Sequence, residues 1–157
     1  MIGLAFTPEQ FKTLLRMVYI ANTVANGHRD IDFEVAYDDL EQYVFSRAKD
    51  AGYPAATSRH KLAGEEHHHP SRVFENDPEV NKLMDEYDLH VMVELLSEKL
   101  AERDVEAMHG KDVKEKMSEE NYENLLEERA DMYDKEFLQH GLANLSLQTG
   151  TATDTPK

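Results

Sequence analysis

The chain has 157 residues, a formal net charge of −15 and no cysteine. It is long enough to bury one substantial core, and it can form no disulfide, thiol nucleophile or thiolate metal site. Residues 75–136 hold 21 acidic and 8 basic side chains, whereas residues 1–74 hold 10 and 8. The negative potential of the C-terminal half repels nucleic acids and anionic membranes and attracts basic partners or cations.

The first predicted helix begins at Thr7, whose hydroxyl is a suitable N-cap, with Pro8 in the first helical position. Gln10 stands where it completes a capping box. Gly27 is a suitable C-terminal end for this helix. Apolar residues recur at helical spacing between these ends: Phe11, Leu14, Leu15, Val18, Ala21 and Ala25. This stripe predicts the most buried helix of the fold.

A second helix is predicted between a cap at Asp30 or Asp32 and a C-terminal glycine at Gly52. Its expected buried face is Phe33, Tyr37, Leu40, Val44 and Ala48, and its expected outer face includes Asp38, Asp39, Glu41 and Lys49. Residues 53–76 follow no sustained period. A segment of that length is long for a loop in a compact domain, so it is either a mobile insertion or a concealed short hairpin.

A third helix, one long or kinked element, is predicted from Asp77-Pro78-Glu79 to His109-Gly110, with a new helix start at Asp88 as the alternative. A fourth is predicted from the cap Ser118 to Gly141. The inner face expected for the third helix is Val80, Leu83, Met84, Tyr87, Val91, Leu95, Leu96 and Leu100; that of the fourth is Tyr122, Leu125, Leu126, Arg129, Tyr133 and Phe137. These four elements predict an all-α, antiparallel four-helix bundle-like single domain over residues 1–145. The polar segment 146–157 predicts a disordered tail.

Histidines beside carboxylates are the candidate metal ligands. Bundles that hold two metal ions use Glu-x-x-His, because this spacing places both ligands on one helix face. Glu106/His109, Glu65/His68 and Glu66/His69 have that spacing, and imidazoles and carboxylates suit divalent transition ions. The candidates are His28, Glu65, Glu66, His67, His68, His69, Glu106 and His109. The alternatives are an exposed polar loop around the histidine run, and a helix-end cap at His28 that interacts with the helix dipole.

No phosphate-binding loop, nucleophile elbow or His-Glu-x-x-His motif occurs in the sequence. The composition therefore predicts a non-enzymatic, acidic helical interaction module that binds a basic protein or a second copy of itself as a homodimer, with no cofactor. One alternative is a metal-dependent helical-bundle enzyme that uses a divalent metal. A second is an acidic mimic of nucleic acid that inhibits a DNA-binding protein. With neither a signal peptide nor a membrane span in the sequence, we expect a cytoplasmic protein.

Overall fold

The computed structural model describes residues 3–146, and its contacts divide the chain into two compact units, Met1–Glu86 and Tyr87–Lys157. Each unit is described by itself. The boundary between the two units lies within residues 1–145, which the sequence predicts as one domain. The single domain stays a prediction. The predicted tail lies, apart from Ser146, outside the described residues.

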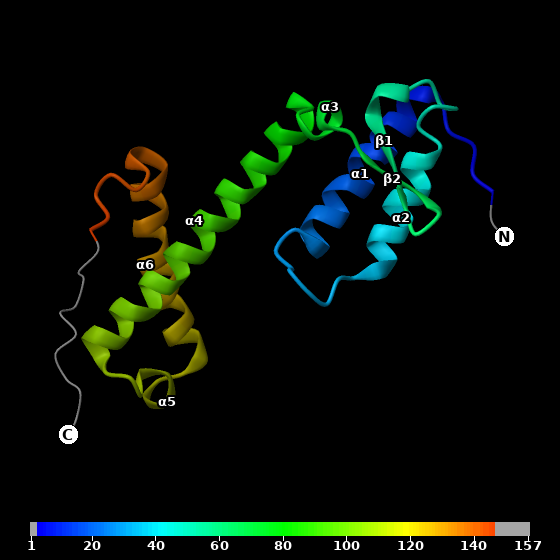
Figure 1. Ribbon diagram of the computed structural model, residues 1–157. Coiled ribbons are helices and arrows are strands. Elements are labelled where there is room, and N and C mark those ends of the chain that lie inside the picture. The colour runs from blue at the N-terminus through cyan, green and yellow to red at the C-terminus, as the bar shows by residue number, and fades with distance from the viewer. Residues whose placement is uncertain (1–2, 147–157) are drawn as a thin grey trace. The chain divides into compact units, whose positions relative to one another are not determined.

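The first unit combines helices with a small sheet (Figure 1). Helices α1 and α2 lie side by side, and a hairpin and a short helix follow them. The elements are α1 (Pro8–Asn26), α2 (Val35–Ser46), the 3-10 turn η1 (Pro54–Ala56), β1 (Thr57–Leu62), β2 (Glu65–Pro70), α3 (Arg72–Glu75) and the beginning of α4 (Pro78–His109).

The two predicted proline-containing helix starts are confirmed. Thr7 Oγ1 accepts a hydrogen bond from the backbone N–H of Gln10, and the Gln10 side chain accepts one from the Thr7 N–H. At the start of α4, Asp77 accepts a hydrogen bond from the Glu79 N–H at 2.9 Å. Asp77 also accepts a hydrogen bond at 2.9 Å from the guanidinium of Arg16, which connects α1 to the first turn of α4.

Phe45 of α2 is the centre of the core of the first unit. Its ring meets that of Phe74, from α3, edge to face at 5.1 Å, and Phe74 meets Tyr19 of α1 in the same way at 5.7 Å. Such edge-to-face pairs stabilise a core beyond the area they bury. The buried cluster consists of Leu15, Val18, Val44, Phe45, Ala48 and Phe74. α1, α2 and α3 are therefore joined around one aromatic centre.

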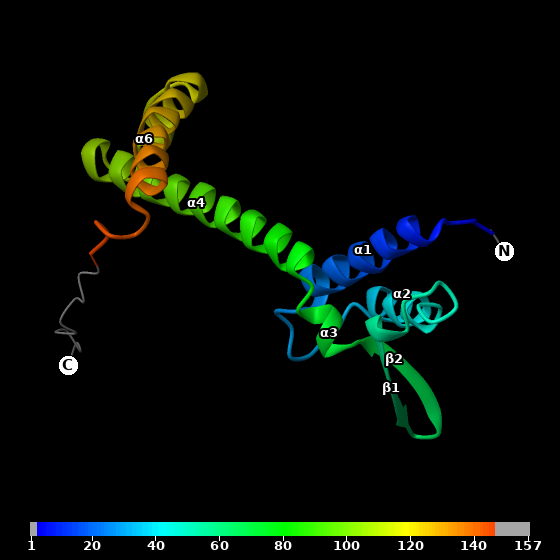
Figure 2. The same ribbon diagram turned by 90° about the horizontal axis from the view of Figure 1, so that it is seen from above.

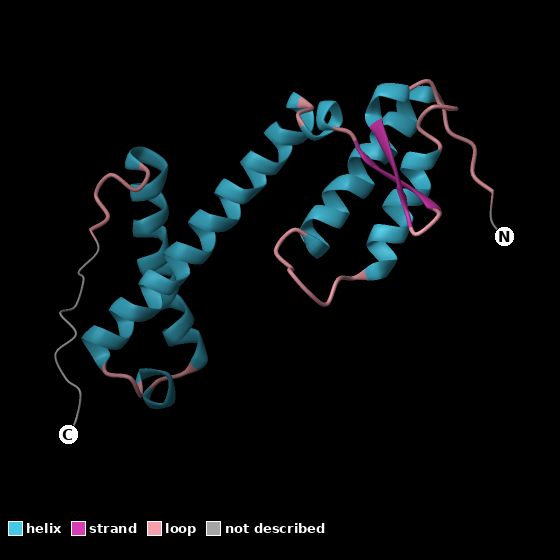
Figure 3. Ribbon diagram, in the orientation of Figure 1, coloured by secondary structure: helices cyan, strands magenta, loops and turns pink. Residues whose placement is uncertain are grey.

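Residues 53–76 form a hairpin and two short helical turns, so the hairpin alternative for this segment is confirmed and the long loop is wrong. The fold is mostly helical with a small sheet rather than all-α. Strands β1 and β2 pair antiparallel from Thr57↔Pro70 to Leu62↔Glu65 (Figure 3). The two-residue turn between them, Ala63-Gly64, has positive φ at both positions (53° and 92°), as tight hairpins require. The sequence offered a hairpin as one alternative here but could not locate its strands, because they are mostly polar and show no alternation of apolar and polar residues.

A buried amide closes the connection between α1 and α2. Asn26 is 8 % exposed, and its side chain exchanges two hydrogen bonds with the backbone of Glu34, donating to the carbonyl at 3.2 Å and accepting from the N–H at 2.7 Å. α2 begins directly after Glu34, without a side-chain cap. The predicted caps Asp30 and Asp32 are therefore wrong, because the anchor for this helix comes from the end of α1.

The described part of the second unit is helical: the remainder of α4, then α5 (Val113–Lys116) and α6 (Glu119–His140). The predicted cap Ser118 is confirmed, since its hydroxyl accepts a hydrogen bond from the Asn121 N–H at 3.3 Å. α4 ends at His109 as predicted, and Gly110 follows with φ 94°. Among the helices that the structure describes, none carries an apolar stretch as long as a membrane crossing needs.

The inner face of α4 differs from the predicted one. Leu83, Tyr87 and Leu95 were expected inside but are 55 %, 61 % and 53 % exposed. The residues of α4 that are buried are Val80, Ser97, Ala101 and Val105. The apolar residues of α4 surround most of the helix, so their spacing alone does not identify which side meets another element. On α6, the predicted inner face is confirmed, since Phe137 is buried and the other five residues predicted there are half-buried.

We expect Asn26→Ala to destabilise the first unit by about 2 kcal/mol, because it leaves both backbone groups of Glu34 without their partner. Thermal or urea unfolding followed by circular dichroism at the helix band measures this. Asn81→Ala is the matched control: Asn81 is exposed on α4, and its replacement should change the free energy of unfolding by less than about 0.5 kcal/mol. Equal effects of the two substitutions would contradict the role of Asn26.

Candidate functional site

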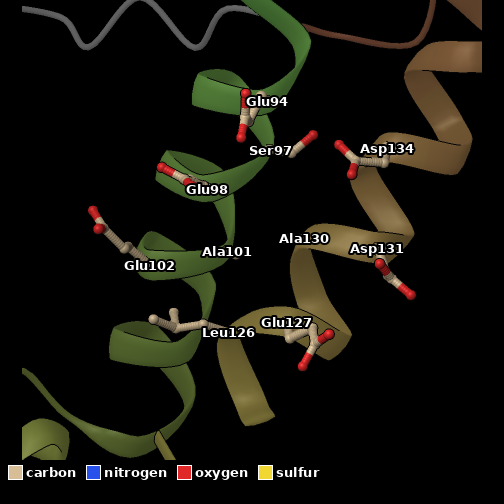
Figure 4. A pocket seen from close by; sticks show the side chains of 10 residues that line it. All are labelled: Glu94, Ser97, Glu98, Ala101, Glu102, Leu126, Glu127, Ala130, Asp131 and Asp134. Carbon is tan, nitrogen blue, oxygen red and sulfur yellow. The ribbon is translucent and has the colours of Figure 1, made fainter. Parts of the chain in front are cut away.

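Two groups of polar side chains are candidates for function, one in each unit. The first, which we call the α4–α6 cleft, lies in the second unit and has a volume of about 490 Å³ (Figure 4). Six carboxylates and no basic side chain line it. Its lining residues are Glu94, Ser97, Glu98, Ala101 and Glu102 from α4, and Leu126, Glu127, Ala130, Asp131 and Asp134 from α6.

The charged and apolar groups of the cleft are separated. Ala101 is fully buried, and Leu126 and Ala130 are half-buried. Figure 4 shows Glu98 and Glu102 extending from α4 away from α6, and Asp131 extending from α6 away from α4. The cleft therefore has an apolar floor and an acidic rim.

Two buried polar atoms face each other within the cleft. Ser97 is 1 % exposed, and its side chain points toward that of Asp134 across the gap between the helices (Figure 4). Within the described residues, neither Ser97 Oγ nor Asp134 Oδ1 has a hydrogen-bond partner. Buried polar atoms are almost always hydrogen-bonded in folded proteins, so this pair is an exception among the described residues.

Only part of the acidic rim is neutralised by neighbouring bases. Glu102 pairs with Lys99 at 2.7 Å and Asp131 with Lys135 at 3.8 Å. In the described part of the chain, Glu98, Glu127 and Asp134 form no ion pair. Like charges held close together repel one another, so the cleft favours a cation.

A hydrogen-bonded pair joins the two helices beside the cleft. Tyr133 of α6 donates to Asp104 of α4 at 2.5 Å, and Arg103 donates to both. Burial and the Asp104 hydrogen bond raise the pKa of Tyr133. Burial by itself would raise the pKa of Asp104, but the hydrogen bonds from Tyr133 and Arg103 lower it. Tyr133 therefore stays a donor and Asp104 an acceptor at neutral pH.

The second group, the α2–β2 cluster, consists of Asp38 and Glu41 of α2 and His69 of β2. One ligand atom from each of the three lies within 4.8 Å of the other two. The i and i+3 positions of Asp38 and Glu41 place both on one face of α2, and β2 packs against that helix. Figure 2 shows the hairpin beside α2. Helix and strand thus bring together donors that lie far apart in the sequence.

Gln42 orients the cluster from one side. Its amide donates to Asp38 Oδ2 at 2.7 Å, and its carbonyl accepts from His67 Nδ1 at 2.9 Å. The rings of His67 and His69 are parallel, with centroids 6.3 Å apart. Because side chains alternate along a strand, His67 and His69 share a face of β2 and His68 lies on the other.

Glu41 is the most buried carboxylate of the cluster, at 4 % exposed. It was expected on the outer face of its helix, which is wrong. Burial raises the pKa of Glu41 from 4.5 to about 7, although a hydrogen bond from Asn22 works against that rise. Within the described residues no basic side chain forms an ion pair with Glu41, so no opposite charge compensates its burial.

The structure brings together only part of the candidate metal ligands that the sequence suggested. His69 joins the α2–β2 cluster and His67 lies beside it, while Glu66 pairs with Arg59 at 3.1 Å. In the described residues, no such cluster of three donors includes His28, Glu65, His68, Glu106 or His109. Whether any of these candidates binds a metal stays a prediction.

The sequence analysis did not include Asp38 and Glu41 among the candidate metal ligands. Their i, i+3 spacing was visible, but it is common on solvated helix faces. Only the position of the hairpin against α2 distinguishes this pair from the many other acidic pairs in the chain.

No known protein family matches the chain, and no curated protein or solved structure is similar to it. Functional inference therefore depends on the chemistry of the two groups described above.

We expect Glu41→Gln to remove a pH dependence of stability. The unfolded chain ionises Glu41 near pH 4.5, whereas the folded protein does so only near pH 7. The free energy of unfolding therefore falls by about 3 kcal/mol as pH rises through this window, and the loss persists above it. Urea unfolding at pH 4.5 and pH 8 measures the difference, which should be smaller in the variant by that amount.

Asp39→Asn is the matched control, because Asp39 is exposed on the same helix and its replacement changes the charge equally. It should leave the pH dependence of the wild type unchanged. A Glu41→Gln variant with the wild-type pH dependence would show that Glu41 titrates normally.

Proposed function

We propose that this protein is a non-enzymatic, acidic helical interaction module whose α4–α6 cleft binds a lysine- or arginine-rich segment of a partner protein. The observation that carries the proposal is the lining of the cleft, with six carboxylates and no base. A DNA-binding protein is one kind of basic partner that such a surface would occupy in place of nucleic acid.

Lysine and arginine match both parts of the cleft. Their long side chains bury apolar stems while keeping a charged head near polar groups, and the cleft offers an apolar floor below a carboxylate rim. The volume of about 490 Å³ is within the range of small-ligand sites, large enough for side chains but not for a folded domain.

We expect the purified protein to bind a fluorescein-labelled peptide of alternating lysine and alanine. The affinity should fall steeply between about 0.1 M and about 1 M salt, where the Debye length shortens from about 10 Å to about 3 Å. Fluorescence anisotropy measures the dissociation constant. The double substitution Glu98→Gln/Glu127→Gln should weaken binding by roughly threefold to tenfold, because it removes two rim charges.

The matched control is Glu115→Gln/Glu128→Gln, which changes the net charge equally at exposed positions outside the cleft. It should retain the affinity within about a factor of two. If both double variants weaken binding to the same extent, the peptide responds to total charge and the cleft is not the site.

A second property, self-association, is favoured by an exposed apolar face on α4. Leu89, Met92 and Leu95 are 59 %, 43 % and 53 % exposed. At 3.6 residues per turn they share one face, and Met92 lies about 180° around the helix from the buried Ala101. Exposed apolar patches commonly mark protein interfaces. We propose that a second copy of the chain covers this face of α4.

Sedimentation velocity over a range of concentrations tests self-association. We expect a dimer that Leu89→Lys/Leu95→Lys converts to a monomer, because two charges then interrupt the apolar face. Leu138→Lys is the control, since Leu138 is 80 % exposed on α6 and its replacement should leave the dimer intact. A wild-type protein that stays monomeric at every concentration would overturn this proposal.

A further inference from the structure

We propose that the α2–β2 cluster is a zinc site in which Asp38, Glu41 and His69 are the protein ligands. The site belongs to the first unit and is independent of peptide binding at the α4–α6 cleft. Nothing in the sequence alone assigned the two carboxylates to it.

The donor set fits zinc. Zn²⁺ binds carboxylate oxygens and imidazole nitrogens at about 2.0–2.2 Å, and sites with three protein ligands leave a fourth position open for water or another ligand. Donors bound at that length in a tetrahedral site lie roughly 3.3 Å apart. The donors of the cluster lie within 4.8 Å of one another, so small side-chain rotations are enough to close it around an ion.

The surroundings support a metal ion rather than an accidental meeting of polar groups. Glu41 is 4 % exposed and forms no ion pair in the described residues, and a buried carboxylate is costly unless a cation compensates its charge. A divalent ion bound between Glu41 and Asp38 would supply that charge. The proposed ligands come from two elements, a helix and a strand. Selective metal sites are built in this way, whereas chelation by consecutive histidines uses a single segment.

A second layer of hydrogen bonds is also present. Metal-binding carboxylates and histidines are usually oriented by further side chains, and loss of these typically weakens metal binding 10- to 100-fold. Gln42 has this position, since it donates to Asp38 and accepts from His67. Gln42 is therefore a positioning residue of the proposed site.

Isothermal titration of the full, untagged chain with zinc chloride tests the proposal. We expect one ion per chain and a rise in the unfolding temperature, because an ion that binds only the folded state stabilises it. His69→Ala should weaken binding at least about tenfold, and Gln42→Ala about tenfold. Asp38→Asn, which preserves the shape of the side chain, should also weaken binding while the helical circular dichroism stays unchanged.

His68→Ala is the decisive control. His68 is the neighbour of His69 but lies on the other face of the strand, so its loss should leave the zinc affinity within about a factor of two. If the consecutive histidines chelated the ion, His68→Ala and His69→Ala would weaken zinc binding equally. That result would overturn the proposal. The absence of stoichiometric zinc binding by the wild type would do the same. Neither result bears on the binding of a basic peptide, which the cleft variants test separately.

Discussion

The first unit depends on the packing of Phe45 against Phe74 between α1 and α2. Phe45 is fully buried, and its edge-to-face contact with Phe74 joins α2 to the segment that follows the hairpin. Both ends of the hairpin are thereby fixed, since η1 packs against α3 and β2 packs against α2. The packing of β2 on α2 places His69 near Asp38 and Glu41. A small apolar core thus determines where the polar chemistry of the unit lies.

The two candidate sites treat negative charge in opposite ways. In the α4–α6 cleft, Glu98 is exposed and Glu102 half-buried, so water screens them while their combined field acts on partners. In the α2–β2 cluster, Glu41 is withdrawn from water, and its carboxylate is stable only when protonated or next to a cation. The first arrangement suits a reversible, salt-sensitive partner. The second suits a small ion held by several donors at once.

Helix ends were predicted where the signal is local. The capping box of Thr7 and Gln10, the cap at Ser118 and the glycine after His109 involve residues within a few positions of each other, so their geometry follows from short-range hydrogen bonding. The prediction for the start of α2 was wrong because the residue that fixes it is not local. Asn26 forms the hydrogen bonds that position Glu34, eight residues further along the chain. α2 therefore begins after Glu34 and not at Asp30 or Asp32, although both are good capping residues.

Composition and local patterns in the chain are sufficient to establish its charge asymmetry, the absence of thiol chemistry, and most of its helices with their ends, because these properties depend on residue type and on neighbours along the chain. The hairpin, the exposed side of α4 and the meeting of Asp38, Glu41 and His69 depended on tertiary contacts. Polar strands carry no apolar alternation, and a helix that is apolar on most sides does not reveal which side will be covered. Three donors separated by up to 31 positions become neighbours only when β2 packs on α2.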